Sequence, residues 1–215
     1  MDDLPSWWVT RRMAVRLGII DVSPMTAWPS EADYRWVEDW ETLGFCIALV
    51  KSRTPQEVLS DLVIAPPTGI VSVDEARRWA YAQTGPSYGT AIEAGEVGGW
   101  TLAVEFNGYQ ATMDNVLRRI SNGTTAVVLY RSVNADMSLQ WALDGVIIRW
   151  FDPLLGTVWE GEPLPEEAGL AFGLGHAMSS ALACAERLSG VHLTPHRLED
   201  RAGWIAIGHH PSPAN

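Results

Sequence analysis

The two segments on either side of Asp144-Gly145 constrain the fold more than any other feature of the sequence. Residues 138–143 and 146–151 are both rich in strand-forming side chains, and Asp-Gly is a dipeptide favoured in two-residue type I′ hairpin turns. A third β-rich segment, residues 125–133, precedes them across a tight loop at residues 134–136. Parallel neighbours need a crossover of about a dozen residues or more, so strands joined this closely must run antiparallel. The middle of the chain therefore predicts an antiparallel meander.

Two earlier segments predict further strands. Residues 43–50 form a short, continuous apolar run, which is typical of a buried strand. Residues 100–106 alternate between apolar and other side chains, which is the pattern of a strand with one face on a core. Asn107-Gly108 then predicts a turn, and Thr112 predicts the cap of a helix that ends at about Ser121.

An apolar stripe near the C-terminus predicts the longest helix of the chain. From about Glu166 to Leu188, apolar residues recur at spacings of three and four, and Gly190 then ends the pattern. Capping boxes that begin at Thr54 and Ser72 predict two shorter helices. The predicted fold class is α+β: an antiparallel sheet (meander) with helices packed on one face, including one long C-terminal helix.

The charge balance excludes some partners. Fifteen Lys and Arg residues stand against 26 Asp and Glu residues, which gives a formal net charge of −11. Nucleic-acid binding needs clustered Lys and Arg, so no nucleic-acid partner is expected. No stretch approaches the roughly 18 apolar residues of a membrane span, and the acidic N-terminus lacks the positive charge of a signal peptide. We therefore expect a cytoplasmic protein with no membrane contact.

The length of 215 residues fits one principal domain with short extensions. We expect a Trp-rich N-terminal arm over residues 1–30, a single α+β domain over residues 31–203, and a C-terminal strand or tail over residues 204–215. The chain contains 11 tryptophans, five of them within the first forty residues. Each indole either packs in a core or contributes to an aromatic groove for a ligand or partner.

Cysteine and histidine spacing predicts neither a metal site nor a reactive thiol. Cys46 and Cys184 both lie in apolar runs, so each is expected to be a buried, unreactive core residue. His192 and His196 are four residues apart, but Thr194-Pro195 between them breaks any shared helix. The sequence contains no Gly-x-Ser-x-Gly nucleophile elbow and no phosphate-binding loop. No metal and no cofactor is therefore expected.

Several segments are characteristic in combination. They are residues 41–50 with 54–59, residues 98–108, residues 133–135 with 143–145 and 150–153, and residues 185–191. With these segments, from about residue 34 to about residue 200, the chain resembles an uncharacterised actinobacterial family of domains of unknown function, catalogued as six-four-six-one. The resemblance implies a bacterial cytoplasmic protein, and it implies no catalytic activity.

Two residues are candidates for acid–base chemistry. His176 lies near the apolar stripe of the predicted long helix, where it is either a boundary residue of the core or a group that faces a pocket. Glu105 alternates with the apolar face of its strand, and it could pair with Arg149 across the outer face if the two strands are neighbours. Such a pair is either a solvated ion pair or the polar floor of a groove.

An aromatic groove on the exposed face of the sheet is the predicted binding site. Its predicted residues are Trp141, Trp150, Trp100, Arg149 and Tyr130.

Two functions remain from the sequence. The first is a non-catalytic binding protein that uses this groove for a protein partner or for an apolar or aromatic small molecule. The alternative is a small-molecule-binding protein or tailoring enzyme of secondary metabolism, with an aromatic pocket between sheet and helix and His176 as the acid–base group. Whether the protein is an enzyme, and its oligomeric state, stay open.

Overall fold

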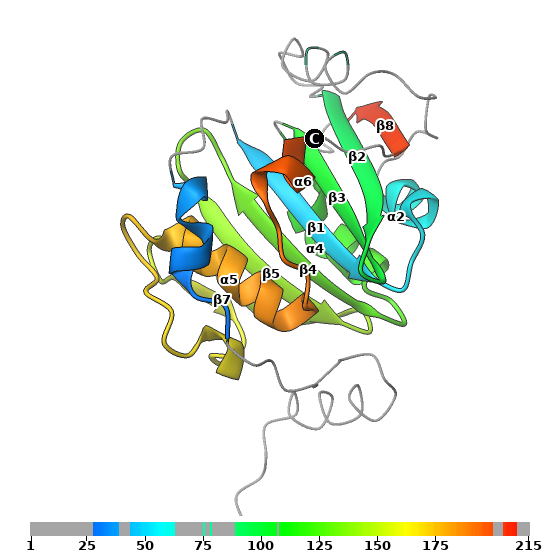
Figure 1. Cartoon of the computed structure of the whole chain (residues 1–215). Helices are drawn as coiled ribbons and strands as arrows, with labels where there is room; N and C mark the ends of the chain where they lie inside the picture. The colour runs from blue at the N-terminus through cyan, green and yellow to red at the C-terminus, as the bar shows by residue number, and fades with distance from the viewer. Residues whose placement is uncertain are drawn as a thin grey trace, which may run out of the picture.

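One antiparallel sheet crosses the protein, with its strands in the order β7-β6-β5-β4-β1-β3-β2-β8 (Figure 1). The computed structural model describes residues 28–38, 44–62, 89–106, 108–199 and 204–209, together with Glu75 and Arg78. The strands are β1 (Phe45–Lys51), β2 (Gly89–Val97), β3 (Trp100–Phe106), β4 (Thr125–Arg131), β5 (Met137–Leu143), β6 (Val146–Phe151), β7 (Val158–Glu160) and β8 (Trp204–His209).

The predicted meander forms one half of this sheet. Strands β4, β5, β6 and β7 pair antiparallel in chain order. The β5–β6 turn has positive φ at both central residues, 49° at Asp144 and 73° at Gly145, as a type I′ turn requires. The antiparallel meander predicted from the sequence is confirmed.

The other half of the sheet depends on a strand from much earlier in the chain. β1 lies between β3 and β4 and pairs antiparallel with both. β2 and β3 form a hairpin through Gly98 and Gly99, which adopt φ values of 55° and 79°. The strand expected after residue 203 is β8, which pairs with β2 at the far edge.

The described helical segments connect and cover these strands. The α-helices are α2 (Pro55–Leu62), α4 (Asp114–Ile120), α5 (Ala177–Ser189) and α6 (Pro195–Glu199). The 3-10 helices are η1 (Glu31–Val37), η2 (Gln110–Thr112) and η3 (Pro165–Glu167). No helix among the described residues is both long and apolar enough to cross a membrane. The predicted arm up to residue 27 and the capping box at Ser72 lie outside the described residues.

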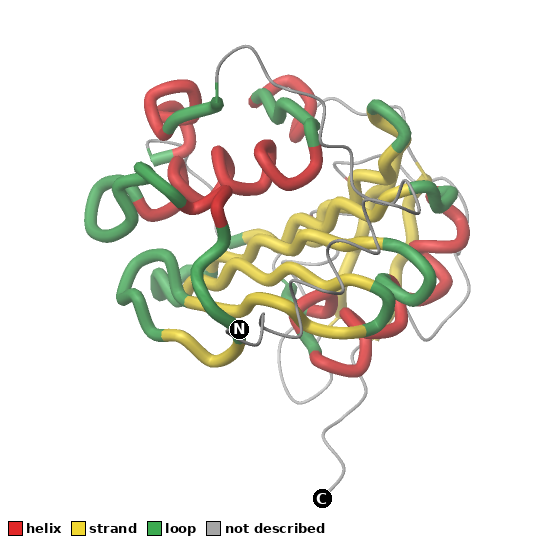
Figure 2. The backbone as a smooth tube through the Cα atoms, turned by 90° about the horizontal axis from the view of Figure 1, so that it is seen from below, coloured by secondary structure: helices red, strands yellow, loops and turns green. Residues whose placement is uncertain are grey.

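Helices cover both faces of the sheet, as Figure 2 shows. The side chains of β1 alternate between two cores: Phe45, Ile47 and Leu49 pack with η1 and α5, and Cys46, Ala48 and Val50 pack with α2 and α4. The α+β class and the antiparallel sheet are confirmed, but the prediction that the helices pack on one face is wrong. The continuous apolar run of β1 is the physical reason, because a strand that is apolar on both faces needs cover on both.

The C-terminal helix is shorter than the apolar stripe predicts. α5 begins at Ala177 rather than near Glu166, and it has 13 residues. Gly173 and Gly175, with φ values of 114° and 82°, take backbone conformations that a right-handed helix does not contain. The C-terminal end is as expected, since Gly190 adopts φ 73° and donates its N–H to the carbonyl of Glu186.

The N-cap of the helix after β3 lies one residue beyond the predicted cap, Thr112. Met113 is the N-cap residue of α4, and the hydroxyl of Thr112 donates instead to the carbonyl of Tyr109 at 2.7 Å. Thr112 therefore belongs to the turn η2 rather than to the helix that follows.

Replacing Gly145 tests the turn that sets the meander. Gly145→Ala should lower the free energy of unfolding by about 1–2 kcal/mol, because a residue with a Cβ is strained at positive φ. Gly95→Ala is the matched control, since Gly95 lies in β2 without a positive φ and its added Cβ would meet no atom within 4 Å. Urea denaturation measures both, and an equal effect of the two substitutions would contradict this account of the turn.

Candidate functional site

The residues predicted to line one groove lie on opposite faces of the sheet. Trp141 pairs with Arg149 across β5 and β6, and both belong to the α5 face together with Trp100. Each of these three side chains is 5 % exposed or less. Trp150 and Tyr130 pack against the other core, under α2 and α4. The aromatic groove predicted on an exposed sheet face is therefore wrong in its geometry, because the helices on both faces bury the strands.

Trp141 is a core residue whose polar atom has a partner. Its indole Nε1 donates to the hydroxyl of Thr125 at 2.9 Å, and that hydroxyl donates to the carbonyl of Ala142 at 3.1 Å. A buried indole needs such a partner, and here the neighbouring strand supplies it.

Trp100 contributes to an open pocket of about 220 Å³ between the turn after β1 and the β2–β3 turn. The lining residues are Ser52, Arg53, Thr54, Glu96, Gly99 and Trp100. The ammonium group of Lys51 lies 6.0 Å from the centre of the Trp100 ring. Of the five predicted groove residues, Trp100 is thus the one that the described pocket includes.

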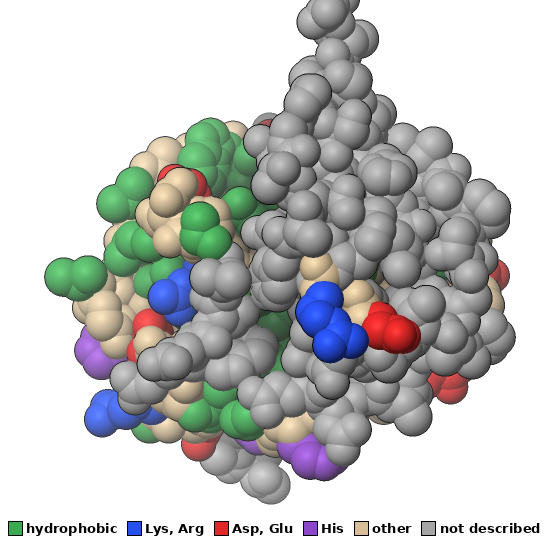
Figure 3. All heavy atoms as spheres, turned by 90° about the horizontal axis from the view of Figure 1, so that it is seen from above, with side chains coloured by type: hydrophobic (Ala, Val, Ile, Leu, Met, Phe, Trp, Pro, Cys, Tyr) green, Lys and Arg blue, Asp and Glu red, His purple; other side chains and the backbone are tan. Residues whose placement is uncertain are grey.

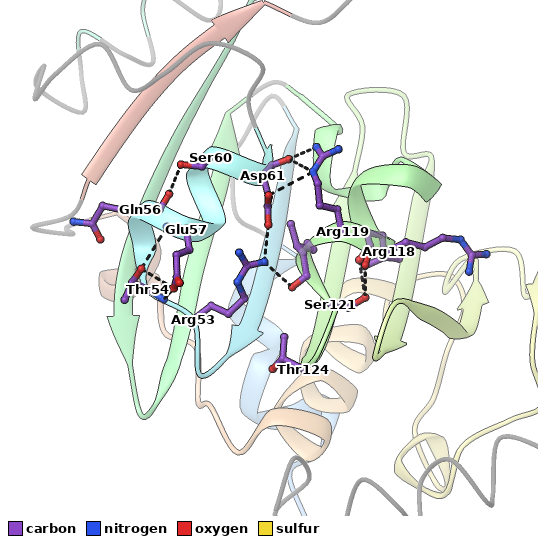
Figure 4. A network of polar contacts seen from close by, with 12 residues as sticks. Arg53, Thr54, Gln56, Glu57, Ser60, Asp61, Arg118, Arg119, Ser121 and Thr124 are labelled. Atoms are coloured by element: carbon purple, nitrogen blue, oxygen red, sulfur yellow. Dashed lines mark hydrogen bonds and ion pairs between the residues drawn. The ribbon is translucent and has the colours of Figure 1, made fainter. Parts of the chain in front are cut away.

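Arg53, which lines this pocket, and Arg119 of α4 are held within the fold (Figure 4). Arg53 donates to the Asp61 carboxylate at 2.6 Å, and Arg119 from α4 lies 3.6 Å from the same carboxylate. Arg119 also donates from Nε to the carbonyl of Asp61 at 3.1 Å. Asp61 therefore joins α2 to α4 and to the turn after β1, and these two guanidinium groups serve the fold.

Arg149 pairs with Glu167, and the expected pair with Glu105 does not form. Strands β5, β4 and β1 lie between β6 and β3, so Arg149 and Glu105 are not on neighbouring strands. The guanidinium of Arg149 donates to both carboxylate oxygens of Glu167, at 2.8 and 2.9 Å, and to the carbonyl of Gly161 at 2.8 Å. This buried bidentate ion pair holds the segment between β7 and α5 against the sheet.

Glu105 is a buried anchor for the turn after β3. Its carboxylate accepts hydrogen bonds from the hydroxyl of Thr90 and the backbone N–H of Gln110, each at 2.6 Å. A Cβ on Gly108 would overlap the same carboxylate, so a larger residue there would have to displace Glu105 from these hydrogen bonds. Gly108 thus lies against the carboxylate of Glu105, which is 2 % exposed, whereas Asn107, the other residue of the predicted turn, lies outside the described residues.

His176 lies immediately before α5, at its N-cap position, and not within a helix. Its backbone carbonyl accepts hydrogen bonds from the N–H of Ser180 at 2.9 Å and from the hydroxyl of Ser179 at 3.1 Å. These hydrogen bonds of the His176 carbonyl are those expected at the start of a helix.

A cluster that nothing in the sequence predicts joins Tyr34, Glu186 and His192. The phenol of Tyr34 donates to Glu186 Oε2 at 2.6 Å, and His192 Nδ1 lies 3.0 Å from the same oxygen. The Tyr34 hydroxyl also accepts the N–H of Leu193 at 3.3 Å. Tyr34 and Glu186 are 152 positions apart, so no local pattern reveals the contact.

This cluster holds η1 against α5 together with two other contacts. Glu38 accepts the backbone N–H of Ser179 at 2.8 Å, near the start of α5. Arg187, near its end, donates to the carbonyl of Pro29 at 2.7 Å and lies 4.9 Å from the Trp28 ring. The segment 28–38 is thus fixed along the length of α5.

Exposed hydrophobic side chains lie at the β7 edge of the sheet. Leu155 is 75 % exposed, Val158 is 51 %, Trp159 is 49 % and Leu174 is 90 %. The N–H of Gly173 donates to the carbonyl of Pro153 at 2.9 Å, which brings the loop of Leu174 beside the turn of Leu155. We name these four residues the β7 edge surface.

Trp159 is the largest member of the β7 edge surface. Its ring lies 5.2 Å from that of Trp150, with an angle of 37° between the planes. One side of this exposed indole thus packs against a second indole, that of Trp150 in β6. Figure 3, the view from above, shows hydrophobic side chains on the left side of the molecule.

The segment that carries this surface contains no Lys or Arg. Between Arg149 and Arg187 the sequence contains no Lys and no Arg. Its acidic residues are Asp152, Glu160, Glu162, Glu166, Glu167 and Glu186. Glu160 and Glu162 are exposed beside Trp159. The β7 edge surface is therefore apolar with a negative border.

The fold and this edge define an α+β protein built on a single antiparallel sheet whose two faces are covered. Among the described residues, no group of three or more His, Cys, Asp or Glu side chains could hold a metal ion. Residues 27–207 match the model of a family of unknown function (DUF6461), so the chain belongs to that family, as the segments named in the sequence indicated. No curated protein and no solved structure matches the chain.

Both cysteines should be unreactive in the folded protein. Burial raises the pKa of the Cys46 thiol, with a further increase from the charge of Glu105, and burial also raises the pKa of the Cys184 thiol. The thiolate is the reactive form, so a thiol reagent such as DTNB should react with neither cysteine before unfolding and with both in denaturant. Val146→Cys, at an exposed position, is the positive control, and a rapid reaction of the native protein would contradict this expectation.

Tyr34 should make stability fall at alkaline pH. Burial, and then the hydrogen bond and charge of Glu186, raise the pKa of Tyr34 above its ordinary value. The unfolded chain then loses this proton first, so stability is complete below pH ~10 and decreases as the pH rises above it. Tyr34→Phe should weaken that decrease, and at pH 8 it should cost about 1–3 kcal/mol because Glu186 and Leu193 lose a partner.

Urea denaturation at neutral and alkaline pH measures both effects of this substitution. Tyr109→Phe is the matched control, because Tyr109 is an exposed tyrosine. An identical pH dependence for the wild type and for Tyr34→Phe would show that Tyr34 does not contribute in this way.

Proposed function

We propose that the protein is a non-catalytic binding protein that docks a partner protein on the β7 edge surface. One observation supports this proposal above the others: Leu155, Val158, Trp159 and Leu174 are about half exposed or more and lie at one edge of the sheet. Exposed apolar patches of this kind, with a polar border, are typical of protein interaction sites. Tryptophan in particular contributes strongly to binding energy at such sites.

The small-molecule alternative has less support. It needs an aromatic pocket between the sheet and α5, with His176 as its acid–base group. Trp141 and Arg149 fill that space as core residues, and the described pocket lies beside Trp100 instead. His176 makes its hydrogen bonds through its backbone.

The cellular setting belongs to the same proposal. A cytoplasmic location agrees with the two free, buried cysteines, because disulfides are rare in reducing compartments. The net charge of −11 opposes contact with a phosphate backbone, so the proposed partner is a protein and not a nucleic acid.

Trp159→Ala should remove partner binding and leave the fold intact. The substitution deletes an indole that is half exposed, so the midpoint of urea denaturation should stay close to that of the wild type, whereas retention of a specific partner in a pull-down from the native host should fall about tenfold or more. Trp28→Ala is the matched control, because Trp28 is 50 % exposed and its ring packs on Arg187 of α5 instead.

Two results would contradict this proposal. One is equal retention of the partner by the wild type and by Trp159→Ala. The other is a bound metabolite, identified by mass spectrometry of the purified protein, together with a turnover that His176→Ala abolishes without a change in circular dichroism.

A further inference from the structure

We infer that the segment bound at the β7 edge surface is basic and apolar, and that it adds to the sheet as a strand beside β7. This inference rests on the proposed function and specifies the chemistry of the partner. Three features of the edge support this inference: its charge, its position in the sheet and the placement of its apolar side chains.

The charge of the edge selects a cationic partner. Glu160 and Glu162 are exposed, and no Lys or Arg occurs in the sequence from residue 150 to residue 186. The cation that precedes this stretch, Arg149, is buried and bound to both oxygens of Glu167. A Lys or Arg on the partner would therefore meet carboxylates that no basic side chain of this segment neutralises.

The position of β7 favours the addition of a strand. β7 ends the strand order and pairs with β6 on one side, so its other side faces no described strand. An edge strand presents backbone N–H and C=O groups that an extended segment can pair with. Because β7 has only three residues, few backbone hydrogen bonds can form there.

The apolar side chains supply the rest of the contact. Leu155 and Leu174 lie on adjoining loops next to this edge, and Trp159 is supported by Trp150. A segment that pairs with β7 can place alternate side chains against these groups, since successive residues of a strand point to opposite faces. The fitting partner segment thus combines Lys or Arg with β-branched or aromatic residues.

A second copy of this chain fits the edge less well. A symmetric dimer would bring Glu160 and Glu162 of both copies into one interface, with no Lys or Arg from residues 150–186 to offset their charge. Each copy also carries a net charge of −11, which adds repulsion over a longer range. Charge complementarity therefore selects a basic partner over self-association.

Selection of random peptides displayed on phage, against the full-length protein, tests the inference. The enriched peptides should carry Lys or Arg next to β-branched or aromatic residues. Their affinity should fall about tenfold in Glu160→Lys and in Glu162→Lys, and it should decrease with added salt. Glu96→Lys is the matched control, since Glu96 is an exposed glutamate on β2, away from this edge.

Hydrogen exchange separates strand addition from contact through side chains alone. Binding of an enriched peptide should slow exchange of backbone amides in Val158–Glu160. Charge-sensitive binding without that protection would overturn the strand addition, and enriched peptides that are neutral or acidic would overturn the basic partner. A dimer of the free protein that already protects these amides would overturn the inference in favour of a second copy.

The proposed function and this inference fail in different ways. If Trp159→Ala abolishes peptide binding but Glu160→Lys and Glu162→Lys do not weaken it, the edge is the binding site and the inferred charge of the partner is wrong. If Trp159→Ala has no effect on peptide binding, the β7 edge surface is not the site, and both proposals are wrong.

Discussion

Burial of β1 on both of its faces is the constraint on which the rest of the structure depends. Its side chains alternate between a core under η1 and α5 and a core under α2 and α4, so the sheet is the middle layer of three. Each face needs its own covering helices. On one face the hydrogen bond of Tyr34 to Glu186 holds η1 against α5, and on the other the ion pairs of Asp61 join α2 to α4. Among the described residues neither face is open at the centre of the sheet, so the binding site that we propose lies at an edge.

The buried polar groups follow from the same constraint. A charged group inside such a layer is costly unless it is paired and hydrogen-bonded. Arg149 meets this need with Glu167, and Glu105 meets it with Thr90 and the N–H of Gln110. Both were candidates for function because they interrupt apolar strands. In the structure these contacts hold loops against the sheet. The exposed apolar side chains, with Glu160 and Glu162 beside them, lie at β7 instead.

Local signals predicted the parts of the fold that depend on local structure. The Asp144-Gly145 turn and the short loops fixed the antiparallel meander, and Gly190 fixed the end of α5. The insertion of β1 between β3 and β4 joins segments far apart in the chain, and no local pattern encodes it. β2 contains Gly95 and two glutamates, so it lacks the alternation of a strand. The prediction of an aromatic groove was wrong for two reasons. A face of a strand cannot be assigned as exposed until the helices that cover it are known. In addition, the register shift next to Trp141 is not visible in the sequence.

Oxidative footprinting of tryptophan in the free, full-length protein tests the central claim most directly. Hydroxyl radicals modify side chains according to their exposure, and mass spectrometry reads each tryptophan separately. Covered sheet faces and an open β7 edge predict fast modification of Trp159 and slow modification of Trp100 and Trp141. Modification of Trp141 as fast as that of Trp159 would show that a sheet face is open, and it would contradict the account.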